Sequence, residues 1–133
     1  MALTVIDAGV IIGILDANDA HHAAASAALS DALQRGDALA IPASAYAELQ
    51  VGPAGRGRAA MRVVDEFLAD LPAEVEPIGR QLAARAAQLR AGHGARLRLP
   101  DALVLATALH LKADRVLTTD AGWPAVGVAV EVI

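Results

Sequence analysis

The segment LTVIDAGVIIGIL, residues 3–15, decides the fold. It begins as a short apolar run with β-branched side chains, which is typical of a buried strand. The run meets the acid Asp7 and then continues with apolar residues at helical spacing. A carboxylate at the end of a buried strand destabilises a protein unless a helix N-terminus or a cation compensates its charge. We therefore expect Asp7 to mark a functional edge of the molecule.

The composition restricts the class of protein. A chain of 133 residues corresponds to one domain, and the absence of cysteine excludes disulfides, thiolate zinc sites and cysteine nucleophiles. Aromatic residues make up 2% of the chain, which disfavours RNA binding by base stacking. The net charge is −4, yet eight of the ten arginines fall between Arg56 and Arg98. With no membrane-spanning run and no signal peptide, we expect a soluble cytoplasmic protein that can hold phosphates locally.

Short apolar runs alternate with longer amphipathic ones along the whole sequence. Strands separated by helices form βαβ units, so we predict a single domain over residues 1–133, with a mainly parallel sheet and helices on both faces. Pro42 is well placed to open a helix after the second strand. One expected strand ends at Asp7, and the others cover 38–41, 75–78, 115–118 and 128–132. Two expected helices begin after Asp7 and after Pro42, and the others cover 21–34, 56–71, 80–91 and 99–112. A break is expected at 52–55.

Four acids are predicted at one edge of this sheet. Asp7 and Asp120 directly follow strands, and ligands of parallel α/β sheets bind at the carboxyl ends of the strands. Glu48 lies one to two turns into the helix that follows the second strand. Asp101 lies in the first turn of its helix, after Pro100. Because strand ends and helix starts share that edge, the four carboxylates can meet there.

Clustered carboxylates repel one another, so they protonate or move apart unless a cation joins them. Oxygen ligands suit Mg²⁺ or Mn²⁺, which can activate water and stabilise charge on a phosphoryl oxygen. The cluster thus favours metal-assisted phosphodiester hydrolysis. Each acid also has a structural alternative: Asp101 as a first-turn acid that stabilises its helix, Glu48 as a solvated helix residue, and Asp120 as a turn residue that accepts backbone hydrogen bonds.

Four blocks of sequence resemble the PIN-domain ribonucleases, in particular the VapC-like toxins of bacterial toxin–antitoxin pairs. The blocks occur in the family's order along the chain, and the third is the most specific. They are VIDA at 5–8, IPAS at 41–44 with Glu48-Leu49, RLPDALVLATA at 98–108, and LTTD at 117–120.

The resemblance implies a three-layer α/β/α sandwich with a five-stranded parallel sheet. It also implies Mg²⁺- or Mn²⁺-dependent endonucleolytic cleavage of RNA, such as tRNA or rRNA, that leaves a 5′-phosphate and a 3′-hydroxyl. Asp7, Asp101 and Asp120 are expected nearest the metal, with Glu48 acting through a water molecule. The family further implies a homodimer and a cognate VapB-like antitoxin, whose C-terminal segment lies across the toxin groove and places a basic side chain in the active site.

Other residues are expected to support the four acids. Ser44 and Thr118 can hold carboxylates through their hydroxyls, although Ser44 can equally cap its own helix. Arg96 and Arg98 precede the third acid and can contact RNA phosphates, which position RNA without reading its sequence. Trp123 either stacks a base or anchors its turn by packing.

Two positions depart from the family pattern. A hydroxyl residue is usual two positions after the first acid, where this chain has Gly9, and the loss of its hydrogen bond is expected to loosen Asp7. Many relatives also carry a further acid after the fourth block, where this chain has Ala121-Gly122-Trp123. These departures keep open a catalytically degenerate PIN-like domain that binds RNA or protein. A phosphoacceptor receiver domain is a third possibility, but its Lys is missing from the predicted edge, since Lys112 ends a helix.

Overall fold

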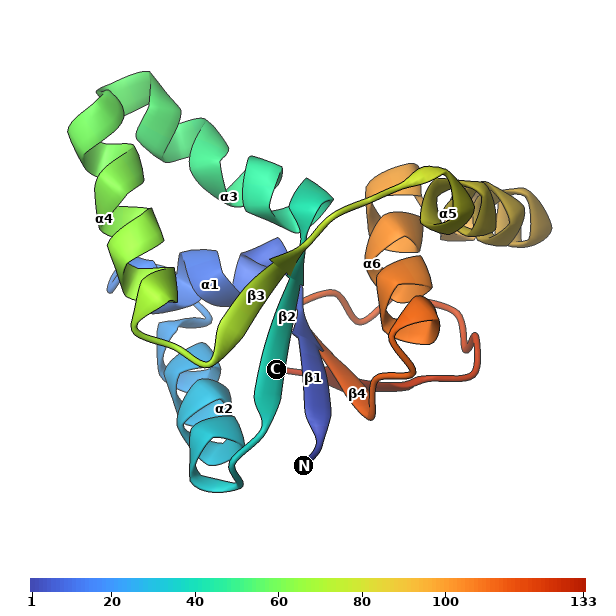
Figure 1. Ribbon diagram of the computed structural model, residues 1–133, viewed down its shortest axis with the longest axis horizontal. Coiled ribbons are helices and arrows are strands. Elements are labelled where there is room, and N and C mark those ends of the chain that lie inside the picture. Colours follow the sequence, from blue (N-terminus) through green and yellow to red (C-terminus); the bar gives the residue numbers. More distant parts are fainter.

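The computed structural model describes every residue from 1 to 133, and its centre is a five-stranded sheet in the order β3-β2-β1-β4-β5 with all neighbours parallel. Helices cover both faces of the sheet (Figure 1). The predicted three-layer α/β/α sandwich is therefore confirmed. The strands are β1 (Leu3–Ile6), β2 (Ala38–Pro42), β3 (Ala73–Glu76), β4 (Arg115–Thr118) and β5 (Ala129–Val132); the helices are α1 (Ala8–Leu15), α2 (His22–Gln34), α3 (Ala43–Arg56), α4 (Arg58–Ala69), α5 (Arg80–His93), the 3₁₀ turn η1 (Gly94–Arg96) and α6 (Leu99–His110).

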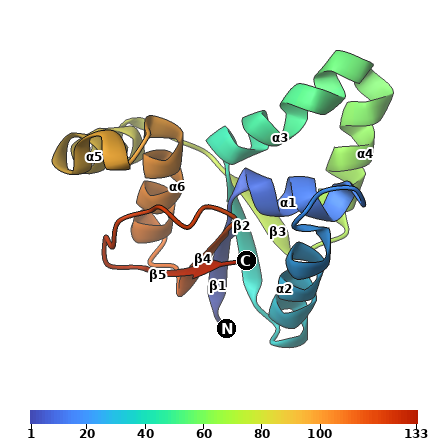
Figure 2. The ribbon, with the colours of Figure 1, turned by 180° about the vertical axis from the view of Figure 1, so that it is seen from behind.

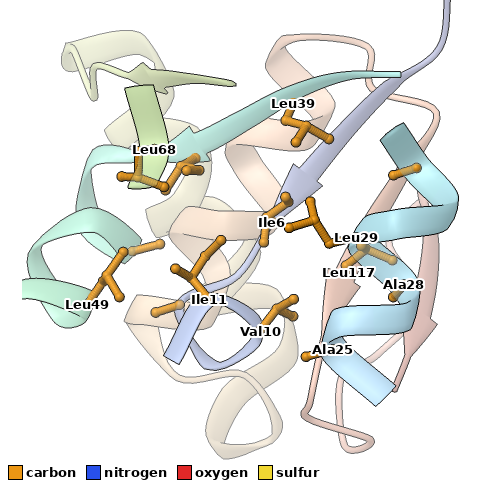
Figure 3. Close-up of a cluster of buried hydrophobic side chains, with 14 of the residues drawn as sticks. Ile6, Val10, Ile11, Ala25, Ala28, Leu29, Leu39, Leu49, Leu68 and Leu117 are labelled. Carbon is orange, nitrogen blue, oxygen red and sulfur yellow. The ribbon is translucent and has the colours of Figure 1, made fainter. Parts of the chain in front are cut away.

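Two hydrophobic cores lie on opposite faces of the sheet because successive strand side chains alternate. Ile6 and Leu117 belong to the first core, which α1 to α4 cover (Figure 3). Their neighbours Val5 and Val116 belong to the second core, which lies under α5 and α6. β1 and β4 are thus buried on both faces, as their continuous apolar sequences predict.

The third and fourth helices form a hairpin that extends beyond the sheet, as the view from behind also shows (Figure 2). The Tyr46 hydroxyl donates a hydrogen bond to Asp65 Oδ1 at 2.6 Å, which ties α3 to α4. Gln50 Nε2 donates to the carbonyl of Met61 at 3.2 Å. The hairpin is therefore held by polar contacts as well as by the apolar side of α4.

The break predicted at 52–55 is wrong. Helix α3 continues through Pro53 to Arg56, and the chain turns at Gly57, whose φ of +116° is open to glycine alone. Proline removes one backbone hydrogen-bond donor, yet α3 continues through Pro53, which is itself buried. β3 likewise starts at Ala73, two residues before the expected strand, and remains an edge strand as predicted.

A buried ion pair network lies at the amino ends of the strands, opposite the four acids. Asp37 is 2% exposed and accepts hydrogen bonds from Arg35 at 2.9 Å, Arg115 at 2.8 Å and Thr4 at 3.0 Å. The network joins the turn before β2 to β1 and β4. None of the helices combines the length and the apolar composition that crossing a bilayer requires.

Candidate active site

Asp7 links the central strand to the first helix. Its backbone N–H donates to the carbonyl of Leu117 at 3.0 Å and so extends the β1–β4 pairing by one residue. Its side chain is the N-cap of α1, because Oδ1 accepts the N–H of Ala8 at 2.9 Å. Oδ2 accepts the hydroxyl of Thr118 at 2.9 Å. Both carboxylate oxygens are therefore fixed while the residue stays half-buried at the end of the strand.

The turn after β4 holds the fourth acid close to the first. Thr118 donates to Asp7 and also accepts the backbone N–H of Asp120 at 3.1 Å. Asp120 Oδ1 in turn accepts the N–H of Gly122 at 2.8 Å. One buried hydroxyl thus connects the two acids, and Asp120 remains exposed with its second oxygen free of protein partners.

Asp101 lies in the first turn of α6, and its side chain is 14% exposed. Arg98, three residues earlier, reaches it with an Nε–Oδ2 distance of 3.6 Å, but that arginine is 75% exposed. The indole N–H of Trp123 is buried without a hydrogen bond of good geometry, and it lies close enough to lower the pKa of Asp101. Arg98 and Trp123 are thus the groups that favour the charged form of this acid.

Glu48 lies on the exposed side of α3, one turn after Ser44. The Ser44 hydroxyl is buried and makes no hydrogen bond. Residues four apart share one face of a helix, so Ser44 and Glu48 lie on the same side of α3. Ser44 thus makes no hydrogen bond to any of the four acids, in contrast to Thr118.

The pKa shifts reveal that the acids lie within electrostatic reach of one another. Burial raises the pKa of Asp7, and the charges of Asp101 and Asp120 raise it further, against the hydrogen bonds from Thr118 and Ala8. Burial also raises the pKa of Glu48, and Asp7 and Asp101 add to this shift.

The third acid is subject to the same effects. Burial and then the charge of Asp120 raise the pKa of Asp101, and Arg98 only partly offsets them. Asp7 and Asp101 are thus each close enough to the other three acids for repulsion. The four acids predicted from the sequence therefore share one edge of the sheet.

The donor set fits a hard divalent cation. All four side chains offer carboxylate oxygens, and each of the three raised pKa values reflects charge that a cation would stabilise. No three carboxylates are close enough to form a complete metal-binding group. This arrangement suits an ion that keeps several water molecules, as Mg²⁺ usually does, and Asp7, Asp101 and Asp120 are the residues that would hold it.

The arginines predicted at the site differ in their surroundings. Arg98 contacts Asp101 and is therefore partly engaged, whereas Arg96 ends η1 with an exposed side chain and no salt bridge. Sequence reasoning did not single out Thr119, whose hydroxyl lies against the first turn of α1. The threonine next to the fourth acid was the available signal, but only the packing of β4 on α1 reveals its neighbour.

A cavity of about 560 Å³ opens beside Glu48, between α1, α3 and α4. Its walls are mainly apolar and include Ile12, Leu49 and Val63. Charged residues at its border are Glu48, Asp16 and Arg56. An apolar groove therefore continues directly from one of the four acids.

Comparison with solved structures shows a shared fold. VapC20 of Mycobacterium tuberculosis, a toxin that cleaves the sarcin–ricin loop, is 17% identical with a TM-score of 0.75, over 95% of this chain and 96% of that one. The toxin–antitoxin complex from Klebsiella pneumoniae is 23% identical with a TM-score of 0.73, over 99% and 97%. FitAcB from Neisseria gonorrhoeae is 26% identical with a TM-score of 0.71, over 96% and 95%.

Sequence comparison gives a family but no characterised relative. No curated protein matches the chain in sequence. Residues 4–129 match the family described as PIN domain, which is nearly the whole chain and includes all four acids. The chain belongs to the PIN-domain family.

Proposed function

We propose that the protein is a metal-dependent endoribonuclease toxin of a toxin–antitoxin pair. The observation that carries this proposal is the meeting of four carboxylates at the carboxyl ends of β1 and β4 and the nearby helix starts, with the pKa values of three of them raised. A structural role would favour acids paired with arginines, as Asp37 is. Of the four acids only Asp101 forms a salt bridge with an arginine, and that arginine is largely exposed.

The side chains have distinct proposed roles. Asp7, Asp101 and Asp120 hold Mg²⁺ or Mn²⁺, directly or through water. When bound, the ion supplies an activated water and stabilises charge on the phosphoryl oxygen. Glu48, from α3, orients the water that attacks the phosphate. Thr118 keeps Asp7 in place, and Ser44 offers its unpartnered hydroxyl to a water molecule or to RNA.

RNA is proposed to approach the edge of the sheet that carries the acids. Arg96 and Arg98 lie before α6 and can contact phosphates on either side of the scissile bond. Structured RNA such as rRNA or tRNA is the proposed substrate, in line with the fold shared with a toxin that cleaves the sarcin–ricin loop. Phosphate contacts do not depend on the base sequence, so the target RNA has to be identified by experiment.

Cleavage of total RNA in the presence of Mn²⁺ tests the activity. Wild type is expected to produce fragments with a 5′-phosphate, whereas Asp7→Asn and Asp101→Asn keep the fold and lose cleavage by at least about 100-fold. Asp31→Asn is the matched control, because Asp31 is an exposed carboxylate on α2. Wild-type cleavage by either site variant would contradict the assignment of the metal site.

A degenerate PIN-like domain is the second candidate. Two observations favour it: no three acids form a complete metal-binding group, and Gly9 replaces the family's usual hydroxyl residue. Such a domain would bind RNA or protein without cleaving it. Calorimetric titration with Mn²⁺ separates the candidates, since a nuclease binds the ion at millimolar concentration or below and the degenerate domain does not.

The cavity beside Glu48 is proposed as the antitoxin site. An amphipathic segment can place apolar side chains against Ile12, Leu49 and Val63, and a basic side chain at its end can pair with Glu48. Occupying this groove would cover Glu48, one of the four acids. A homodimer is also proposed, and sedimentation of the purified chain tests it.

The groove can be tested with the co-expressed antitoxin. Ile12→Glu places a charge on the apolar wall and is expected to weaken antitoxin binding by about 100-fold, while RNA cleavage by the free toxin remains. Val51→Glu is the matched control, because Val51 is 72% exposed and does not line the cavity. Equal effects of both variants would contradict the proposed groove.

A further inference from the structure

A side chain at Gly9 would meet the side chain of Thr119. A Cβ built at this position would lie 2.6 Å from Thr119 Oγ1, closer than real Cβ contacts, whereas the Cγ2 and Cβ atoms of Thr119 would lie at the ordinary distances of 3.6 and 3.7 Å. Only the hydroxyl of Thr119 causes the conflict. Residue 9 lies in the first turn of α1, two residues after its cap, Asp7.

Thr119 lies in the chain between the threonine that binds the first acid and the fourth acid itself. Thr118 binds Asp7 and accepts the N–H of Asp120, and the hydroxyl of the next residue, Thr119, lies against Gly9 of α1. Thr119 is half-buried, and its hydroxyl takes part in no hydrogen bond within the chain. It is therefore free to bind a water molecule at the edge where the acids meet.

We propose that Thr119 is a positioning residue that supplies, from the turn after β4, the hydroxyl that Gly9 lacks on α1. The inference rests on the proposed metal site. Gly9 and Thr119 form a matched pair: one position carries the hydroxyl, and the other must stay empty. The hydroxyl binds a water molecule between Asp7 and Asp120 and so holds both acids in place for the metal ion. The departure at Gly9 is thus offset by a residue from another element.

Substitutions at both positions test the packing. Gly9→Ala is expected to lower Tm by about 3–6 °C, because the new Cβ meets Thr119 Oγ1. In the Thr119→Ala background the same change is expected to leave Tm unchanged or to raise it, since the conflicting oxygen is gone and alanine favours a helix. Equal effects of Gly9→Ala in the two backgrounds would overturn the pairing.

Titration with Mn²⁺ tests the hydroxyl. Thr119→Val keeps the shape of the side chain and is expected to weaken Mn²⁺ binding about tenfold, whereas Thr119→Ser keeps the wild-type affinity. Gly9→Ser/Thr119→Ala returns a hydroxyl from the helix and is expected to restore binding. Gly9→Ala/Thr119→Ala fits equally well but carries no hydroxyl, and it is expected to remain weak.

The outcomes separate this inference from the proposed function. Wild-type affinity in Thr119→Val would overturn the role of the hydroxyl and leave the nuclease proposal in place. No Mn²⁺ binding by the wild type would overturn the nuclease proposal together with the role of the hydroxyl. In either case, the Tm values of the Gly9→Ala variants test the packing of Gly9 against Thr119 separately.

Discussion

At the scale of single residues, Thr118 connects more of the site than any acid does. Its hydroxyl donates to Asp7 and accepts from the backbone of Asp120. We predict that Thr118→Val raises the pKa of Asp7 further, because the donor that lowers it is lost. The unpaired N–H of Asp120 is expected to cost about 1 kcal/mol of unfolding free energy. Carboxyl titration by NMR and urea unfolding measure the two effects.

The same substitution elsewhere provides the control. Thr107 is also buried, and its hydroxyl donates within α6 to the carbonyl of Leu103 at 2.7 Å. Thr107→Val is expected to change stability without shifting the pKa of Asp7 or the affinity for Mn²⁺. If both variants shift the pKa of Asp7 equally, the hydroxyl of Thr118 does not act on Asp7 specifically.

The places of some of these residues in the site could be predicted from the sequence and those of others could not, for physical reasons. Asp7 could be placed because a strand end and a helix start adjoin it in the chain, and its capping bond to Ala8 is local. Thr119 could not be placed, because its neighbour Gly9 is 110 positions away and only their packing brings them together. Ser44 shows the converse: its position on the right helix face was predictable, whereas its lack of a partner depends on tertiary contacts.

At the scale of elements, the network of Asp37 fixes the turn before β2 against β1 and β4. Burial raises the pKa of Asp37, but the hydrogen bonds of Arg35 and Thr4 and the charges of Arg35 and Arg115 outweigh it, so the pKa is lowered. We predict that Asp37→Asn costs about 2–4 kcal/mol of unfolding free energy at pH 7. This cost lies toward the lower end of what breaking a buried ion pair usually costs, because one partner, Arg35, is 44% exposed.

The direction of the pH effect follows from the lowered pKa. The stabilisation by Asp37 is present above the unfolded pKa, near 4, and is lost as the pH falls through the folded value. The difference between wild type and Asp37→Asn should therefore shrink in acid, which urea unfolding at several pH values measures. Asp114→Asn, at the same edge but exposed, should change stability little, because an amide oxygen can still accept the N–H of Leu3. Loss of RNA cleavage in Asp37→Asn at full folding would contradict a purely structural role.

The elements themselves were predictable where their signals are local. β4 has the predicted bounds, since its apolar run ends at turn residues, and Pro100 places the start of α6. The α3–α4 turn was misplaced because Gly52 and Pro53 are the stronger local breakers, while the actual turn at Gly57 depends on how the two helices pack. Local propensity therefore gave the order of elements, and tertiary packing decided where this helix ends.

At the scale of the whole molecule, the acid cluster opposes folding while it is free of metal. The pKa values of Asp7, Glu48 and Asp101 are raised, so the folded chain binds more protons than the unfolded chain between the unfolded pKa values, near 4, and the folded ones. The unfolding free energy contributed by these groups is therefore greatest in acid and falls as the pH rises through that window. Asp37 contributes with the opposite sign at the other edge of the sheet.

Asp7→Asn should change which protein, wild type or variant, is the more stable with and without metal. Without metal at pH 7, the variant is expected to have a higher Tm than wild type, because it removes a buried charge that Asp101 and Asp120 repel, while an amide oxygen can still accept the N–H of Ala8. With Mn²⁺ at 100 times its Kd, wild type gains about 2.7 kcal/mol and the variant gains little, so their order changes. Calorimetric melting with Mn²⁺ and with a chelator measures both orders. A variant that is less stable than wild type under both conditions would show that Asp7 serves the fold more than the metal.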